Sequence, residues 1–209
     1  MEADLTSLQS LIPTKGEAKL LELLSYEEST EGWEDLGIDD EVESSRLYMP
    51  TGYYLIRGVG DIDQSAADIH ALILDLDRKQ EWDQMYVEGR VVANLTPAAR
   101  ILYQHFSAPW PVSHRDFAFL SYSKHLEDGS IISAGFSVET PLVPEVSGLV
   151  RGEMHMAGFI LRQVAPKLTR MTYLVHIDPK GSIPTMVINQ TQKKQTQNVS
   201  KIRNYLAQH

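Results

Sequence analysis

The 209 residues are 43% hydrophobic and 22% charged, a composition typical of a globular protein with a large apolar core rather than of a disordered chain. The chain has no cysteine, which excludes disulfides, Cys-ligated zinc, iron–sulfur clusters and a thiol nucleophile. Residues 1–45 carry 13 Asp or Glu against Lys15 and Lys19, so the net charge of −11 there leaves residues 46–209 at +2. We expect no nucleic-acid partner, because phosphate backbones repel acidic chains and the remainder shows no basic stripe.

The N-terminal residues do not resemble a secretory signal. Glu2 and Asp4 stand where a signal peptide has basic residues, and no stretch approaches the roughly 20 apolar residues of a membrane span. We therefore expect a cytoplasmic protein. With no internal repeat, the simplest organisation is one domain over residues 1–209, with an acidic N-terminal helix and loop in residues 1–45 and a core in residues 46–209.

The first predicted elements follow from local capping and periodicity. Thr14 followed by Glu17 reads as a capping box that opens a short helix ending near Leu24. The acidic run 27–43 reads as a solvated face or loop, with an interaction site as the alternative. Residues 46–49 and 53–62, rich in Tyr, Ile and Val, predict strands.

Ser65 predicts the start of a second helix, because Asp68 stands at its third position. Apolar residues then recur at helical spacing, and the helix should end near Asp77. Strand periodicity follows near 88–95, 100–107, 115–125, 130–139, 150–164 and 169–178. Asp128-Gly129 indicates a tight hairpin between two of these strands, and the short connections favour an antiparallel meander.

Residues 182–209 predict one long C-terminal helix, with Pro184 tolerated in its first turn. Its apolar stripe is interrupted by polar residues, including Thr191 and Gln195, which is unusual for a helix on a dry core. Helices beside a curved antiparallel sheet indicate an α+β fold in which the sheet wraps a helix and encloses a cavity.

Four ordered motifs then carry a resemblance: DRKQEWD at 77–83, PWPVSHRDF at 109–117, VRG at 150–152 and HIDPKGSIP at 176–184. Together they resemble the START family of steroidogenic-acute-regulatory-protein-related lipid-transfer domains, over roughly residues 30–209. The resemblance implies the helix-grip fold, a lipid cavity between the sheet and the C-terminal helix, and two lid loops at 107–114 and 140–149.

Two loop segments are candidates for membrane contact. Trp110 lies between two prolines, where a large amphipathic aromatic suits a bilayer interface, although a buried structural Trp is the alternative. Leu142 and Val143 lie in the other, apolar loop. If both loop tips are exposed together, they form a transient docking patch.

Arg78 and Lys79, just before Trp82, are the candidate head-group residues. The resemblance places them where phosphatidylcholine-binding relatives hold the lipid phosphate with an Arg, and the alternative is a solvated helix end. Tyr103, Tyr122 and Tyr173 are candidates for a choline cage or ordinary sheet residues. We add Trp82, His105 and the polar positions Thr191 and Gln195 to the candidate lipid site.

The remaining expectations concern chemistry. Arg115 and Asp116 read as a structural pair at a strand start. None of His105, His155 and His176 has a metal-like partner at close spacing, so we predict no metal, and no cofactor. The acid and arginine pair of sterol-binding relatives aligns near His105 and Ser121 and is not reproduced. We therefore expect a monomeric phospholipid carrier rather than an enzyme; a sterol carrier, a lipid sensor or a helix-grip enzyme are the alternatives.

Overall fold

The computed structural model describes residues 2–183, 187 and 194–209. The described elements are α1 (Glu2–Ser10), η1 (Ile12–Gly16), α2 (Glu17–Glu28), β1 (Trp33–Asp39), β2 (Val42–Tyr48), β3 (Tyr54–Ile62), α3 (Ala66–Leu74), α4 (Lys79–Trp82), β4 (Tyr86–Thr96), β5 (Ala99–Phe106), β6 (Arg115–His125), β7 (Ile131–Ser137), β8 (Val150–Arg151), β9 (Glu153–Ala165), β10 (Leu168–Asp178) and α6 (Asn198–Leu206).

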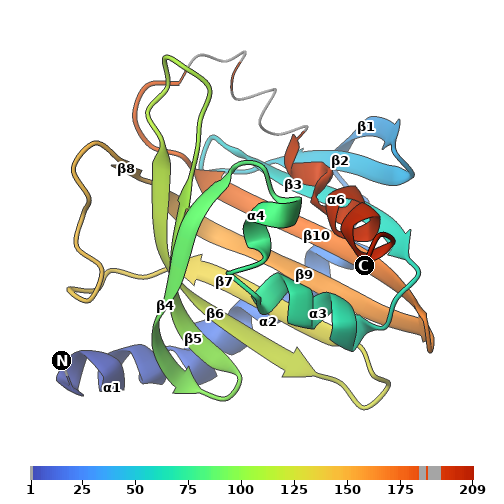
Figure 1. The fold of residues 1–209 in the computed structure, drawn as a ribbon, viewed down its shortest axis with the longest axis horizontal. Coiled ribbons are helices and arrows are strands. Elements are labelled where there is room, and N and C mark those ends of the chain that lie inside the picture. Colours follow the sequence, from blue (N-terminus) through green and yellow to red (C-terminus); the bar gives the residue numbers. More distant parts are fainter. Residues whose placement is uncertain (1, 184–186, 188–193) are drawn as a thin grey trace.

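One curved sheet forms the centre of the molecule (Figure 1). Its strand order is β1-β2-β3-β10-β9-β7-β6-β5-β4, with the two-residue β8 paired in parallel to β6. The pairs along this order are antiparallel. The predicted meander holds from β4 to β10, apart from the short β8. The sheet then continues from β10 to β3, so the first three strands join it through a crossover that local patterning did not predict.

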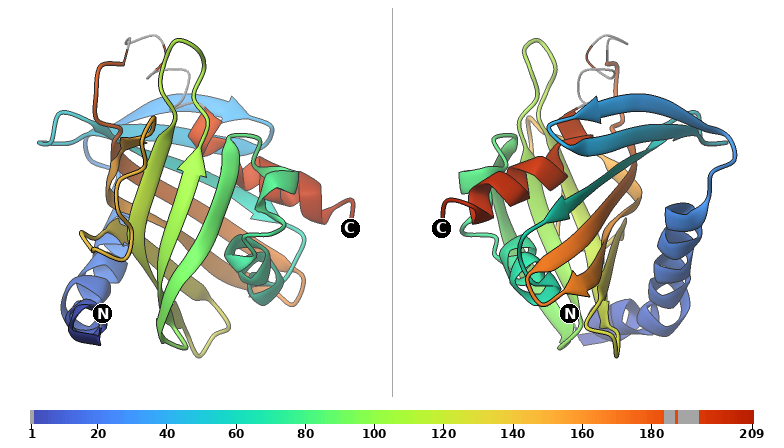
Figure 2. Two further views of the ribbon diagram at one scale, coloured as in Figure 1. Left: turned by 60° about the vertical axis from the view of Figure 1, so that its left-hand side comes forward. Right: turned by 90° about the vertical axis from the view of Figure 1, so that its right-hand side faces the viewer.

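Helices cover both faces of the sheet (Figure 2). On the outer face, Leu20 and Leu23 of α2 pack with Leu55, Ile160 and Leu174. On the inner face, α3 and α6 share a second core with strands β3 and β10. The C-terminal helix is thus held against the concave side of the sheet, as the α+β helix-grip prediction requires. The N-terminal helices support the convex side.

The helix predicted at Ser65 is confirmed. The Ser65 hydroxyl accepts from the Asp68 backbone N–H at 3.1 Å and caps α3. Ile69, Leu72 and Ile73 are buried on one face. The helix ends at Leu74, three residues before the predicted end, because Asp75 adopts an extended backbone conformation. The Asp128-Gly129 hairpin is also confirmed: Gly129 has a φ of 84° between β6 and β7.

The N-terminal prediction needs correction. Thr14 does not cap a helix, because the chain is already helical from α1 through η1 into α2, and its hydroxyl donates backward to the Ser10 carbonyl at 3.3 Å. The acidic run is not a loop throughout, since it contains edge strand β1, paired to β2. The acidic side chains of β1 are exposed, as expected for a solvated sheet edge.

The long C-terminal helix predicted over 182–209 is described only in part. Helical backbone occurs at 194–196 and in α6, where Val199, Ile202 and Tyr205 are buried. Thr191 lies outside the described residues.

Candidate functional site

A pocket of about 260 Å³ lies between the concave face of the sheet and helices α3, α4 and α6. Side chains of β5, β6, β9 and β10 form most of its wall, including Leu102, Phe117, Phe119, Met154 and Val175. At one end the wall consists of residues 107–109 and 112 together with Pro179 and Ile183, which we call the mouth. The mainly apolar wall suits an apolar ligand of modest size.

Strand geometry decides which predicted residues face this pocket. Side chains alternate between the two faces of a strand, and on β5 the pocket receives Arg100, Leu102, Gln104 and Phe106. Tyr103 and His105 therefore lie on the outer face. Tyr103 packs with Ala118 and Val143, and His105 bonds to His114 at 3.1 Å.

The alternation of side chains along a strand also places the predicted tyrosines on different faces of the sheet. Tyr122 points outward from β6 and donates to the Glu17 carboxylate at 2.7 Å. Tyr173 of β10 lines the pocket, and its burial raises the pKa of the phenol. The predicted choline cage is not assembled, because only one of its three tyrosines faces the pocket.

Lys79 is the charged centre of the site. Its Nζ donates to Gln104 Oε1 at 3.0 Å and lies 5.3 to 5.5 Å from the ring centroids of Trp82, Tyr86 and Phe106. Loss of hydration on burial lowers the pKa of this ammonium to about 8, and the nearby Asp83 carboxylate opposes the shift. The ammonium is therefore charged at neutral pH within a largely apolar wall.

Arg78 faces away from Lys79. It is exposed, and its guanidinium donates to the Tyr205 hydroxyl at 2.8 and 3.2 Å while lying over the Tyr205 ring. Of the basic pair, the structure brings only Lys79 to the pocket.

Two other predicted site residues, Trp82 and Gln195, lie on the helical side of the pocket. Trp82 is buried and lines it, and its Nε1 has no acceptor among the described residues. Gln195 also lines the pocket. Asp83 and Lys201 meet there with Oδ1 and Nζ 3.4 Å apart.

Four polar residues of the pocket wall that were not predicted bear on its chemistry: Arg100, Gln104, Asp83 and Lys201. Arg100 and Gln104 alternate in step with Leu102 and Phe106, so correct placement of one residue on β5 would have identified the rest. The Asp83–Lys201 pair joins residues 118 positions apart, which no local pattern reveals.

The mouth is fixed by Arg115 at the start of β6. Its Nε and Nη2 donate to the carbonyls of Pro179 at 3.1 Å and Lys180 at 2.9 Å, and it also bonds to the Ser113 carbonyl. Trp110, in the loop beside it, is 92% exposed. The aromatic side chain therefore projects into solvent from the loop that forms one wall of the mouth.

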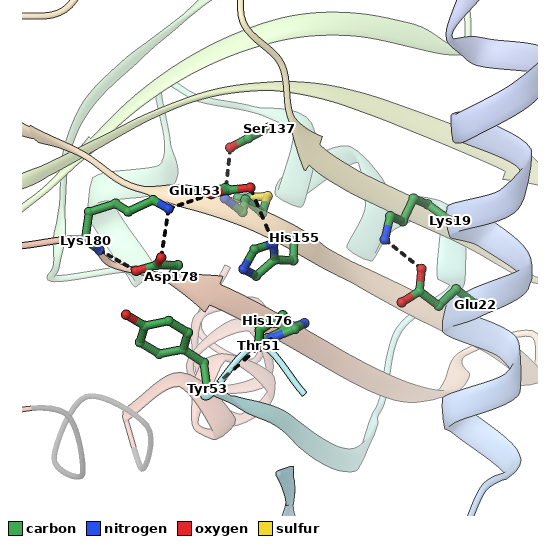
Figure 3. Close-up of polar contacts among 11 residues, drawn as sticks. Lys19, Glu22, Thr51, Tyr53, Ser137, Glu153, His155, His176, Asp178 and Lys180 are labelled. Atoms are coloured by element: carbon green, nitrogen blue, oxygen red, sulfur yellow. Dashed lines mark hydrogen bonds and ion pairs between the residues drawn. The ribbon is translucent and has the colours of Figure 1, made fainter. Parts of the chain in front are cut away.

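Figure 3 shows how the end of β10 is held on the outer face. Lys180 bridges the carboxylates of Glu153 at 2.7 Å and Asp178 at 2.8 Å. Beside them, the rings of His155 and His176 lie 4.6 Å apart, and His176 Nε2 bonds to the Thr51 hydroxyl at 2.8 Å. These contacts support the segment that leads from β10 to the mouth.

The second predicted lid loop lies elsewhere. Val143 is buried against Tyr103 on the outer face, and Leu142 is half-buried beside it, so neither joins Trp110 at the mouth. Asp116 is buried and accepts from Arg151 Nε and Nη2, both at 2.9 Å. Arg151 also donates to the Val143 and Pro144 carbonyls, which ties the loop to the sheet. Asp116 thus pairs with Arg151 rather than with its neighbour Arg115.

Residues 14–208 match the START domain. The chain belongs to the START domain family. Mouse START domain-containing protein 10 is 30% identical over 129 residues, which are 62% of this chain and 44% of that protein. Mouse phosphatidylcholine transfer protein is 24% identical over 159 residues, covering 74% of this chain and 73% of that protein. The chain therefore matches less than half the length of the first of these relatives.

The structure of human StAR-related lipid transfer protein 5 has the same fold. It superimposes with a TM-score of 0.88 at 24% sequence identity, over 96% of this chain and 98% of that chain. The helix-grip prediction is confirmed. START domains bind hydrophobic lipid ligands, and the apolar pocket of this START domain is consistent with that activity.

The described part of this START domain contains neither a cluster of metal ligands nor a helix that could span a membrane. Within residues 2–183, 187 and 194–209, no group of three or more His, Asp or Glu side chains is placed to hold a metal ion. No helix in the same ranges has both the length and the apolarity that a membrane crossing demands.

Proposed function

We propose that this chain is a monomeric lipid carrier of the cytoplasm, which holds one lipid, preferably a phospholipid, in the pocket and exchanges it at membranes. The observation that carries the proposal is the ammonium of Lys79, which is partly buried within an apolar wall. A lipid supplies both matching parts, apolar chains for the wall and a polar head for the charge. Phosphatidylcholine transfer protein is one of the relatives, which agrees with such a ligand.

Lys79 favours a phospholipid over a sterol. A phosphate oxygen that accepts from the ammonium forms a charge-assisted hydrogen bond, which repays part of the cost of burying the charge. A sterol offers one neutral hydroxyl and leaves that cost largely uncompensated. A sterol carrier or a lipid sensor remains the alternative, and the lipid recovered from the protein distinguishes them.

Exchange requires the mouth to open at a bilayer, and Trp110 is suited to make the first contact. Its exposed ring follows Pro109 at the pocket wall, and Trp side chains are enriched at the level of lipid head groups. Each methylene that moves from water into the pocket contributes about 0.8 kcal/mol, so the chains supply retention. The head group then supplies selectivity.

Transfer of a fluorescent phospholipid between two vesicle populations tests the carrier function. We expect the wild-type protein to accelerate transfer, and Trp110→Ala to slow it several-fold while leaving the amount of bound lipid unchanged. Tyr48→Ala is the matched control, because Tyr48 is an exposed aromatic outside the pocket wall, at 62% exposure. No acceleration by the wild type would reject the carrier function, and wild-type transfer by Trp110→Ala would reject the role of Trp110.

An enzyme is less well supported by the pocket. The nearest arrangement to a catalytic pair is His70 Nε2, 3.1 Å from the Ser123 hydroxyl, which in turn lies 2.8 Å from the Ser133 hydroxyl. Of these three residues only Ser133 lines the pocket, and His70 does not contact it directly. A base that cannot reach the accessible hydroxyl does not activate it.

A further inference from the structure

Arg100 is a charged side chain in the pocket wall whose role the carrier function does not explain. Its Nη2 donates to the Leu74 carbonyl at 3.0 Å. Across the described parts of the chain, no Asp or Glu forms an ion pair with it, and loss of hydration lowers the pKa of its guanidinium. The Leu74 carbonyl, at the C-terminus of α3, occupies one of five N–H donors and offsets only part of the charge.

Arg100 lies at the inner end of the pocket. In the β5–β6 ladder it is opposite Ser121, whereas the mouth begins beyond the pair Phe106 and Arg115. Six residues of strand separate the two positions on β5, a span of about 20 Å. The Ser121 and Ser133 hydroxyls also line the pocket. A ligand group that reaches Arg100 therefore enters a recess that carries a positive charge and neutral hydrogen-bonding partners.

The net charge of the described lining is positive, like that of Arg100. Among its described residues, the basic ones are Lys79, Arg100, Arg115, Lys194 and Lys201, and the acidic one is Asp83, which is already paired to Lys201. The chain as a whole carries a net charge of −9. A basic pocket in an acidic protein is a local feature that attracts an anion.

A zwitterionic head group fits this lining poorly. The rings of Trp82 and Phe106, which line the pocket and would otherwise receive a ligand ammonium, already flank the Lys79 ammonium, with each ring centroid 5.5 Å from Nζ. A choline or ethanolamine group there would meet a like charge. An oxyanion without an accompanying ammonium has no such repulsion, and it would neutralise cations that are costly to bury.

We propose that the pocket selects an anionic lipid, whose phosphate-monoester or carboxylate head group binds Arg100 at the inner end while its chains extend toward the mouth. This proposal rests on the proposed lipid-carrier function and specifies its ligand class. Lys79 contributes a second positive charge, since the charge of Arg100 acts on the Lys79 ammonium.

The test is a competition for the pocket. The full chain is incubated with vesicles that contain equal amounts of phosphatidylcholine, phosphatidylethanolamine, phosphatidic acid, oleic acid and cholesterol, then re-isolated, and its bound lipid is extracted and quantified by mass spectrometry. We expect at least tenfold enrichment of phosphatidic acid or oleic acid over phosphatidylcholine. The more enriched of the two identifies the phosphate or the carboxylate as the head group.

Three variants attribute the selectivity to Arg100. Arg100→Gln should lower the enrichment about tenfold, and Arg100→Lys should retain much of it. Arg90→Gln is the matched control, because Arg90 is an exposed arginine that lies over the Tyr103 ring on the outer face. Thermal unfolding reports whether each variant is folded. If Arg100→Gln does not fold, Lys79→Met replaces it and should also lower the enrichment.

The outcomes separate the two proposals. Stoichiometric phosphatidylcholine, phosphatidylethanolamine or cholesterol in the wild type would overturn the anionic ligand and leave the lipid carrier intact. Unchanged enrichment in Arg100→Gln would show that Arg100 only caps α3, and would likewise overturn the proposal. Protein without any bound lipid would reject the carrier function itself.

Discussion

At the scale of single residues, Lys79 shows that the site is formed at the expense of stability. Within the described part of the chain, its ammonium has one hydrogen-bond partner, Gln104, and burial in the pocket wall lowers its pKa to about 8. An unfolded lysine titrates near 10.4, so the folded protein binds its proton less tightly than the unfolded chain does. A cost of this kind is common where a site is prepared for a charged ligand.

Lys79→Met should therefore stabilise the ligand-free protein at pH 7. The shift in pKa corresponds to about 3 kcal/mol, and leaving Gln104 without its donor offsets part of it, so we expect a net gain of about 1 to 2 kcal/mol. Because the pKa of Lys79 is lower in the folded protein, the cost of burying its charge is full below pH 8 and disappears as the pH rises toward 10.4. The stabilisation by Lys79→Met should therefore shrink over that range. Urea unfolding of the wild type and of Lys79→Met at pH 7 and pH 10 measures this stabilisation.

Lys167→Met is the control for that measurement, because Lys167 is exposed in the turn between β9 and β10. It should change the free energy of unfolding little, and equally at both pH values. A loss of stability in Lys79→Met at pH 7 would contradict the burial cost.

The direction of individual side chains on β5 could not be predicted from the sequence. On β5, Ile101, Leu102 and Tyr103 are consecutive and each is at most 3% exposed, because one face lines the pocket and the other is covered by N-terminal helices and the 140–149 loop. A strand buried on both faces shows no apolar–polar alternation. The sequence therefore predicts the strand but not which of its residues face inward. The prediction that Tyr103 and His105 face the pocket is wrong by one position, because Leu102 and Gln104 line it.

At the scale of elements, prediction succeeded where a local signal exists. The Ser65 cap and the Asp128-Gly129 turn have short-range chemistry that operates in any context, and both are present. The sequence did not predict strand β1, and the predicted Thr14 capping box is wrong, because neither feature is determined by a local signal. Whether acidic residues pair as an edge strand, or a Thr begins a helix, depends on the neighbouring strand β2 or helix α1.

The 140–149 loop illustrates an element whose position is set by one distant ion pair. Asp116 is 1% exposed, and both of its oxygens accept from Arg151, which binds the loop carbonyls of Val143 and Pro144. Asp116→Asn removes the charge and turns an amide donor toward the guanidinium. We expect it to lower the free energy of unfolding by about 2 to 3 kcal/mol and to speed proteolytic cleavage within 140–149.

Glu34→Gln provides a stringent control for Asp116→Asn. Glu34 accepts two hydrogen bonds from Arg46, at 2.8 and 2.9 Å, but the pair is exposed. Loss of the Glu34–Arg46 pair should lower the free energy of unfolding much less than Asp116→Asn does, because solvent screens an exposed pair. Equal costs for the two variants, measured by urea unfolding, would show that burial does not strengthen the Asp116 pair.

At the scale of the whole molecule, the C-terminal helix belongs to the main core. Val199, Ile202 and Tyr205 of α6 share one buried cluster with α3 and with strands β2, β3 and β10. The acidic β1–β2 turn adds polar contacts, since Arg203 pairs with Asp40 and Glu41. Arg203 of α6 thus contacts a turn that lies 163 positions earlier in the chain, and no local sequence pattern predicts such a contact.

If α6 is an integral part of the core, weakening its packing should weaken the whole fold. Ile202 is fully buried, so Ile202→Ala should lower the free energy of unfolding by about 2 to 5 kcal/mol. Urea unfolding followed by circular dichroism should remain one transition with an unchanged denaturant dependence. As a control, Leu21→Ala on α2 should change the free energy of unfolding little, because the Leu21 side chain is 64% exposed. A separate early transition in Ile202→Ala would instead show that α6 detaches on its own, and exchange of the ligand would then need no loosening of the sheet.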